Sequence, residues 1–365
     1  MISLIRLKNF KSIRDVGDLH LKPINILIGS NGAGKSNLIA FFQLLRNIYE
    51  QNLRGYVAEN GGVNNLLHFG RKTSNFIEGQ VFFGNQAYNS SFYHFQLNPN
   101  QANGFYFEKD IGAVRANLPN EDHLPSIWSP ESYTKGHEES QMNALFREEF
   151  KADFQNFKVY HFEDTSANSP LKQARKVSDN RTLSENGGNL PSLLYLLQEK
   201  YPANFKLIEA TIRSIAPFFQ RFDLAPDRLN SEYIQLEWKE QGSDMYFNAH
   251  NLSDGTLRMM CLVTLLLQPD LPKTIIIDEP ELGLHPSAIN KLAGLMRSAS
   301  TKSQLIVSTQ SVNLIDNFNP EDIIVVDRKD RQSVFTRLKE EELKEWLETY
   351  SLGELWDKNI IGGRP

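Results

Sequence analysis

The sequence GSNGAGKS at residues 29–36 constrains the fold of this chain more than any other feature. It follows the apolar run PINILI, which is bounded by a proline and a glycine and predicts a short buried strand. Apolar side chains then recur at steps of three and four, as on one face of a helix: Leu38, Phe41, Phe42, Leu45 and Ile48. A strand, a glycine-rich turn and a helix in this order are the context that the phosphate-binding pattern G-x-x-x-x-G-K-S requires. The sequence therefore predicts a P-loop.

The residues of this loop predict how a nucleoside triphosphate would be bound. Glycines let backbone N–H groups turn toward phosphate oxygens, and the dipole of the following helix adds a favourable field. Lys35 would reach the β- and γ-phosphates, and the Ser36 hydroxyl would hold Mg²⁺. ATP and Mg²⁺ are the expected cofactors. The expected nucleotide-binding residues are Gly29, Ser30, Asn31, Gly32, Ala33, Gly34, Lys35, Ser36 and Asn37.

A second motif, TIIIDEP at residues 274–280, ends an apolar run in two adjacent carboxylates. A buried strand would deliver Asp278 to the carboxyl edge of a sheet, where it would bind Mg²⁺ together with Ser36. Glu279 would polarise a water molecule against the γ-phosphate, because the metal and the nucleophile need separate carboxylates. Alone, this pattern also fits a strand with a solvated acidic end. A P-loop in the same chain makes the catalytic interpretation the stronger one.

A third motif, NLSDGTLR at residues 251–258, places small polar residues directly before an apolar run that predicts a helix. The first turn of a helix carries N–H groups without intrahelical partners, so such a start can bind an anion. Taken alone, the pattern fits a plain N-cap by Ser253 or Asp254 better. We expect Asp254 to turn away and cap its own helix, because a γ-phosphate would repel its carboxylate.

The P-loop, LSDGT and IIIDEPE, in this order, resemble the ABC-type ATPases. In that family the signature turn of one subunit caps the ATP bound to the other subunit, and a dimer encloses two nucleotides. The resemblance implies a homodimer or a higher even oligomer. It also implies that Ser253, Gly255 and Thr256 bind the γ-phosphate held by the partner.

Several further stretches resemble the SMC, RecF and OLD-type heads: LIRLKNFKSI, YHFEDTS, EPELGLHP, QLIVSTQSVNLID and LGELWDKNIIGGRP. Together they cover nearly the whole chain. The resemblance implies that Lys11 approaches the nucleotide, with a plain surface lysine as the alternative. Gln310 stands where the switch histidine of ABC ATPases usually lies, and its amide could donate to the γ-phosphate but cannot titrate near neutral pH. The Q-loop glutamine is not identifiable. Gln80 lies in an alternating strand and is expected to be structural. By analogy, the loop EDTS at residues 163–166 is a better place to look for the equivalent of the Q-loop.

The predicted fold class is α/β: a P-loop NTPase and ABC-type ATPase head, with a mixed sheet and an inserted helical lobe. Apolar strands alternate with helices after residue 254, which favours a layered domain. We expect an ATPase lobe made of residues 1–100 and 231–365, and an insertion at 101–230 that is first rich in loops and then helical. Prolines and scattered aromatics in that interval, without sustained heptads, exclude a long coiled coil.

Composition indicates which partners and which cellular compartment to expect. The net charge of −5 gives no global sign of a nucleic-acid binder, and the one cysteine, Cys261, can form no internal disulfide. The longest apolar run, at residues 259–267, is much shorter than the roughly 20 residues of a membrane span. A cytoplasmic protein without a membrane partner is expected. His161 and His285 are not spaced as a metal pair and are expected to be structural.

These features predict a slow ATPase that acts as a switch. Proteins of this kind occur in bacterial anti-phage defence and toxin–antitoxin-like systems. No nuclease domain is recognisable after the acidic helix KEEELKEWLETY, so we expect a separately encoded effector, a nuclease or a toxin. The alternative is a RecF-like clamp that binds DNA in repair. A scaffold that only holds ATP is disfavoured by Glu279, and a transporter subunit fits least.

Overall fold

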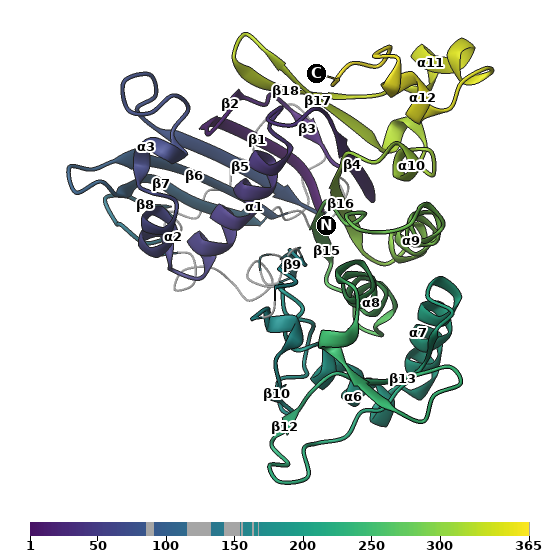
Figure 1. Cartoon of the computed structure of the whole chain (residues 1–365). Helices are drawn as coiled ribbons and strands as arrows, with labels where there is room; N and C mark the ends of the chain where they lie inside the picture. Colours follow the sequence, from purple (N-terminus) through teal and green to yellow (C-terminus); the bar gives the residue numbers. More distant parts are fainter. Residues whose placement is uncertain are drawn as a thin grey trace. The chain divides into compact units, whose positions relative to one another are not determined.

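The computed structural model describes residues 1–84, 91–114, 133–141, 154, 156–162, 164–166 and 168–364 (Figure 1). The chain divides into two compact units. The first is Met1–Phe157 with Asn319–Pro365, and the second is Lys158–Phe318. The lobe boundaries expected at residues 100 and 230 stay a prediction.

A large antiparallel sheet dominates the first unit. Its strands are β1 (Ile2–Phe10), β2 (Ile13–Asp15), β3 (Leu19–His20), β5 (Ile77–Phe83), β6 (Ser91–Pro99), β7 (Phe105–Val114) and β8 (Tyr133–Thr134). They pair in the order β2-β1-β5-β6-β7-β8, with β3 on the side of β1. Every second side chain of β5 is buried, as the alternation in its sequence requires. One face of the sheet is therefore a core face.

Helix α1 (Lys35–Tyr49) packs its apolar stripe on that face (Figure 1). The ring of Phe41 lies 6.3 Å, between centroids, from both Phe10 on β1 and Phe95 on β6. Gly79 on β5 makes room for Phe95, because a Cβ there would overlap its ring. All five apolar side chains expected on the stripe are fully buried, which confirms the predicted helix. Two short helices, α2 (Leu53–Glu59) and α3 (Val63–Leu66), follow it.

A second set of strands in the first unit supports the P-loop. Strand β4 (Ile24–Ile28) is parallel to β17 (Ile323–Lys329), which is antiparallel to β18 (Gln332–Arg337). Strand β4 leads directly into the P-loop and α1, so the strand–loop–helix context is confirmed. The remaining elements of this unit are the 3₁₀ turn η4 (Pro320–Asp322) and helices α11 (Glu340–Leu347) and α12 (Leu352–Asp357).

The second unit combines parallel strands with a helical part. Strands β15 (Thr274–Asp278) and β16 (Gln304–Thr309) are parallel, and their register sets Asp278 opposite Ser308. The helices of this unit are α6 (Leu190–Lys200), α7 (Pro202–Ile215), α8 (Asp254–Leu267), α9 (Pro286–Ala299) and α10 (Val312–Ile315). The shorter elements are β9 (Phe157–Tyr160), which begins at the end of the first unit, η2 (Pro170–Lys172), β10 (Arg175–Lys176), β11 (Phe219–Phe222), β12 (Tyr233–Ile234), β13 (Glu237–Glu240), β14 (Tyr246–Asn248) and η3 (Ala249–Asn251).

Within the insertion, whose first part was expected to be rich in loops, the polar segment at residues 163–190 contains a short strand. Strand β10 pairs with β12, whose residues come more than fifty positions later, so no local pattern could predict it. The proline-containing stretch with Pro119, Pro125 and Pro130 lies outside the described residues. Within the described part of the chain, the longest helix is α1, with 15 residues, and no helix could span a membrane.

Candidate functional site

The P-loop has the backbone geometry that only glycine allows. Gly29, Gly32 and Gly34 adopt positive φ values of 156°, 78° and 118°. A Cβ on Gly29 would overlap the carbonyl oxygen of Val326, and one on Gly34 would overlap the Ser333 hydroxyl. Backbone of this kind curls tightly, and a tightly curled loop is what a phosphate-binding cradle of N–H groups requires. The glycine spacing thus fits a triphosphate.

Lys35 begins α1 and is 5% exposed, with its ammonium group inside the curled loop. Its Nζ donates hydrogen bonds to the carbonyl oxygens of Gly29 (2.6 Å) and Ser30 (3.2 Å). The next residue, Ser36, is exposed, so its hydroxyl is accessible to a ligand. The two carbonyl groups thus hold the Lys35 ammonium group at the P-loop, where it could contact bound phosphates.

Hydroxyl groups tie the loop to the first hairpin. The Ser12 hydroxyl lies 2.6 Å from the Ser333 hydroxyl and accepts from the side-chain amide of Asn37 at 2.6 Å. Ser333 also donates to the carbonyl oxygen of Ala33 at 2.5 Å. Sequence reasoning missed Ser12 and Ser333, because the contact joins residues more than three hundred positions apart. This network of hydrogen bonds holds the P-loop at Ala33 and Asn37.

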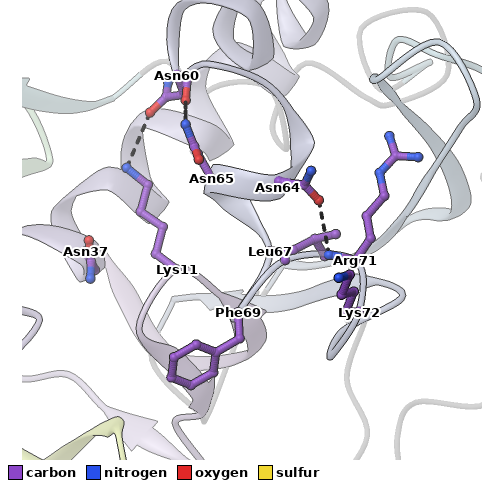
Figure 2. A pocket seen from close by; sticks show the side chains of 10 residues that line it. Lys11, Asn37, Asn60, Asn64, Asn65, Leu67, Phe69, Arg71 and Lys72 are labelled. Atoms are coloured by element: carbon purple, nitrogen blue, oxygen red, sulfur yellow. Dashed lines mark hydrogen bonds between the residues drawn. The ribbon is translucent and has the colours of Figure 1, made fainter.

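Lys11 and Asn37 line a pocket of about 740 Å³ (Figure 2). Its other lining residues are Asn60, Asn64, Asn65, Leu67, Phe69, Gly70, Arg71 and Lys72. Lys11 has a left-handed backbone (φ 48°), and its N–H and carbonyl groups bond Leu66 and His68. Its Nζ donates to the Asn60 side chain (3.3 Å), and burial lowers its pKa. The pocket is thus basic, and Asn37 joins it to the P-loop.

The segment after α12 packs against the first glycine of the P-loop. Gly362 and Gly363 have φ values of 80° and 75°. A Cβ on Gly363 would lie 2.8 Å from Val325 Cγ1 and 3.4 Å from the Cα of Gly29. The close approach depends on glycine on both sides, so this segment supports the shape of the loop.

We expect Gly363→Ala to weaken ATP binding roughly tenfold, because an added methyl group overpacks the Gly29 side of the loop. Isothermal titration calorimetry would measure the change. Gly17→Ala is the matched control: Gly17 has a similar φ of 66° but nothing within 4 Å of its Cβ position. Both variants carry the strain of a left-handed alanine. Equal ATP affinities for the two would show that the contact with Gly29 is without effect.

In the second unit, the acidic pair is bonded to the end of β16. The Ser308 hydroxyl donates to Asp278 Oδ1, and the Gln310 side-chain amide donates to Glu279 Oε1. The backbone N–H of Glu279 also donates to the Ser308 carbonyl at 3.0 Å. Glu279 has a φ of 43°, a strained value of the kind that occurs at functional sites. The structure therefore brings Glu279 and Gln310 together, as their proposed roles require.

Ser253 is the N-cap of α8. Its Oγ accepts from the Thr256 N–H at 3.2 Å and lies 2.8 Å from the Thr256 hydroxyl. The expectation that Asp254 caps its own helix is wrong. Asp254 lies in the first helical turn, and its carboxylate is 3.6 Å from the Lys172 ammonium group. That cation offsets the repulsion that Asp254 would exert on a phosphate.

The signature turn is joined to the loop that follows the acidic pair. A Cβ on Gly255 would overlap the Gly283 carbonyl oxygen, so only glycine fits. Arg258 donates to the carbonyl oxygens of Leu282 (2.6 Å) and Phe162 (3.0 Å). Arg258 and Lys172 were not predicted, since their partners are distant in sequence. These bonds couple the position of the turn to that of the acidic pair.

The remaining predicted residues have structural partners. Gln80 accepts from Arg6 at 3.3 Å, and His285 is the N-cap of α9. Cys261 is fully buried, which raises the pKa of its thiol. Of the loop at residues 163–166, Glu163 lies outside the described residues, and a Q-loop equivalent in this loop stays a prediction.

Oxygen ligands suited to Mg²⁺ are present in both units, as the exposed Ser36 hydroxyl and the half-buried Asp278 carboxylate. No group of three or more metal-ligating side chains occurs among the described residues. A site with few protein ligands fits Mg²⁺, which is commonly held by one or two side chains together with substrate phosphates. The joint site of Ser36 and Asp278 stays a prediction.

The P-loop lies in the strand–loop–helix unit that is typical of P-loop ATPase folds. Residues 24–316 match the family model described as "AAA domain, putative AbiEii toxin, Type IV TA system", and the chain belongs to this family. A comparison with curated proteins gave no match.

Two solved structures have the same fold at low identity. One is a crystal structure of an Smc head bound to the C-winged helix domain of ScpA: 15% identity, TM-score 0.65, covering 94% of this chain and 99% of that one. The other is an Smc head domain with an extended coiled coil, bound to the C-terminal domain of ScpA derived from Pyrococcus furiosus. It has 14% identity and a TM-score of 0.60, and covers 95% of this chain and 98% of that one. These matches confirm the predicted fold class.

Proposed function

We propose that this chain binds ATP with Mg²⁺, hydrolyses it slowly and dimerises around two ATP sites. Closure of the dimer would control a separately encoded effector, a nuclease or a toxin, in bacterial anti-phage defence. The observation that carries the ATPase proposal is the P-loop itself. A Cβ on Gly29 or on Gly34 would overlap neighbouring atoms, and Lys35 is buried in the curve of the loop.

Each of the proposed site residues has a separate role in phosphoryl transfer. Lys35 and the loop N–H groups bind the phosphates, and the pocket lined by Lys11 and Asn37 would receive the rest of the nucleotide. Bound Mg²⁺ would supply charge stabilisation, with Ser36 and Asp278 as its protein ligands. Glu279 orients the attacking water, and Gln310 donates to the γ-phosphate. A neutral amide is a weaker donor than a protonated imidazole, which favours slow turnover.

The dimer proposal rests on the signature turn. Ser253 is exposed, and Gly255 and Thr256 are half-buried, so the turn is accessible at the start of α8. Members of the ABC-type branch use this turn to cap the γ-phosphate held by a second subunit. A carboxylate at position 254 is compatible with that role here, because Lys172 is paired with it.

A separate effector is supported by the family and by the related heads. The family description names a toxin and a toxin–antitoxin system, and both Smc heads are bound to another protein, ScpA. We propose by analogy that this head also engages a protein partner, in the cytoplasm.

The test of the dimer is the molar mass of the Glu279→Gln protein by light scattering, with and without ATP and Mg²⁺. Gln preserves the shape of the site and stalls hydrolysis, so ATP should convert monomer to dimer. Adding Ser253→Arg should abolish the shift. Arg also removes the N-cap, at a cost of about 1 kcal/mol. Adding Ser253→Ala instead removes the same cap without adding bulk. It therefore separates the loss of the cap from the steric block by arginine.

An ATP-bound protein that stays monomeric would contradict capping of one subunit's ATP by the other. A dimer already present without nucleotide would instead indicate constitutive assembly. In that case ATP acts by closure within the dimer, and Ser253→Arg should block closure rather than assembly.

A further inference from the structure

Glu281 is a buried carboxylic acid to which the proposed mechanism gives no role. It is 8% exposed, two residues after Glu279. Its Oε1 accepts from the Thr309 hydroxyl (2.5 Å) and from the backbone N–H of Gln310 (3.0 Å). Its Oε2 is buried and has no hydrogen-bond partner in the part of the chain that the structure describes. Burying a carboxyl group is unfavourable, and burial raises the pKa of Glu281. A purely structural position would be filled more stably by an apolar side chain.

The two donors that Glu281 binds belong to the turn that carries Gln310. Thr309 ends β16, and its hydroxyl also accepts from the Ser311 N–H at 3.0 Å. The backbone of Glu281 is itself held in place, because its carbonyl oxygen accepts from the Leu284 N–H at 3.0 Å. The carboxylate therefore clamps the peptide between Thr309 and Gln310.

This clamp fixes the backbone position from which the Gln310 side chain extends. A glutamine side chain has three rotatable bonds, so it holds one orientation only if its backbone is fixed and its amide is bonded. In this structure the amide donates to Glu279 Oε1. A primary amide has two N–H groups, so the second can donate to a γ-phosphate oxygen while the first holds Glu279. One side chain could thus align the carboxylate with the phosphate.

We propose that Glu281 is a positioning residue for ATP hydrolysis: it clamps the Thr309–Gln310 peptide so that the Gln310 amide lies on the Glu279 carboxylate. The inference rests on the proposed function, in which Glu279 orients the attacking water. Glu281 itself touches neither nucleotide nor water in this scheme. Its loss should slow the chemical step and leave ATP binding intact.

The test compares Glu281→Met with Glu281→Gln in steady-state ATP hydrolysis. Methionine has a similar length and no strong acceptor, so kcat should fall at least tenfold while KM changes less than about threefold. Glutamine keeps an acceptor oxygen for both donors, so kcat should stay within about threefold of the wild type. Thr309→Val, which removes one of the two donors, should give an intermediate kcat. This variant also preserves the test if Glu281→Met does not fold.

Two measurements separate positioning from a structural role. In a Glu279→Gln background, Glu281→Met should cause little further loss, because both substitutions act on the same carboxylate. The melting temperature of Glu281→Met should equal or exceed that of the wild type, since an apolar side chain replaces a buried acid. The matched control is Glu209→Met. Glu209 is a half-buried carboxylate that, like Glu281, accepts a backbone N–H, here from Phe222 at 2.8 Å, and its loss should leave kcat unchanged.

Each result decides between the proposals. An unchanged or raised kcat in Glu281→Met would overturn the inference, as would an equal loss in the Glu279→Gln background. The wild type and the single Glu279→Gln variant test the proposed function separately. If the wild type does not hydrolyse ATP, or if Glu279→Gln leaves hydrolysis unchanged, the proposed function fails, whatever the Glu281 variants do.

Discussion

Replacing Glu279 with glutamine should lower kcat for ATP hydrolysis at least 100-fold and leave the ATP affinity within about threefold of the wild type. General-base assistance of this kind contributes roughly 10²–10⁴-fold to a rate, and an amide cannot provide it. Glutamine has the same shape, and its carbonyl oxygen can still accept the bond from Gln310 that Glu279 accepts now. The effect should therefore be confined to the chemical step. Phosphate release and equilibrium binding of labelled ATP would measure the two quantities.

Glu321→Gln is the appropriate control for this prediction. Glu321 is an exposed glutamate that pairs with Lys22, and it has no place in the proposed site. Its replacement should leave both kcat and ATP affinity unchanged. If Glu279→Gln retained most of its activity, another group would have to orient the water. The Glu281 inference would then lose its basis too.

The sequence predicted the parts of the fold and site that are encoded locally. The helix at residues 35–49 was predictable because its apolar side chains recur at helical spacing and must be buried together. The P-loop was predictable because glycine, lysine and serine at fixed spacing have few other uses. Asp278 and Glu279 could be placed at a strand end because an apolar run stops there.

The parts of the fold and site that could not be predicted depend on contacts between segments that are distant in sequence. Ser308 meets Asp278 only through the parallel register of β15 and β16. Glu281 meets Gln310 for the same reason, and Gly363 meets Gly29 only after the chain has returned to the P-loop. The residues next to Ser308, Glu281 and Gly363 in the sequence do not show which distant residues these three contact. The error about Asp254 has a similar cause, because its partner Lys172 lies in the 3₁₀ turn η2, about eighty residues earlier.

Lys35→Met should abolish nucleotide binding without destabilising the protein. Methionine keeps the aliphatic part of the side chain and removes the ammonium group that bonds Gly29 and Ser30 inside the loop. Burying an ammonium group is unfavourable, so the melting temperature without nucleotide should not fall when that group is removed. The wild type should gain about 2.7 kcal/mol at an ATP concentration 100 times its Kd, a shift of roughly 5 °C. Lys35→Met should show no shift.

Lys22→Met is the control for a general loss of positive charge, because Lys22 is half-buried and pairs with the exposed Glu321. It should keep the full ATP-induced shift in melting temperature. A Lys35→Met protein that melts well below the wild type without ATP would assign Lys35 a structural role in the loop. One that keeps the shift would show that the nucleotide binds elsewhere, and neither the P-loop nor Glu279 would then belong to the site. The two substitutions thus distinguish a lysine that binds phosphate from one that only fills the curve of the loop.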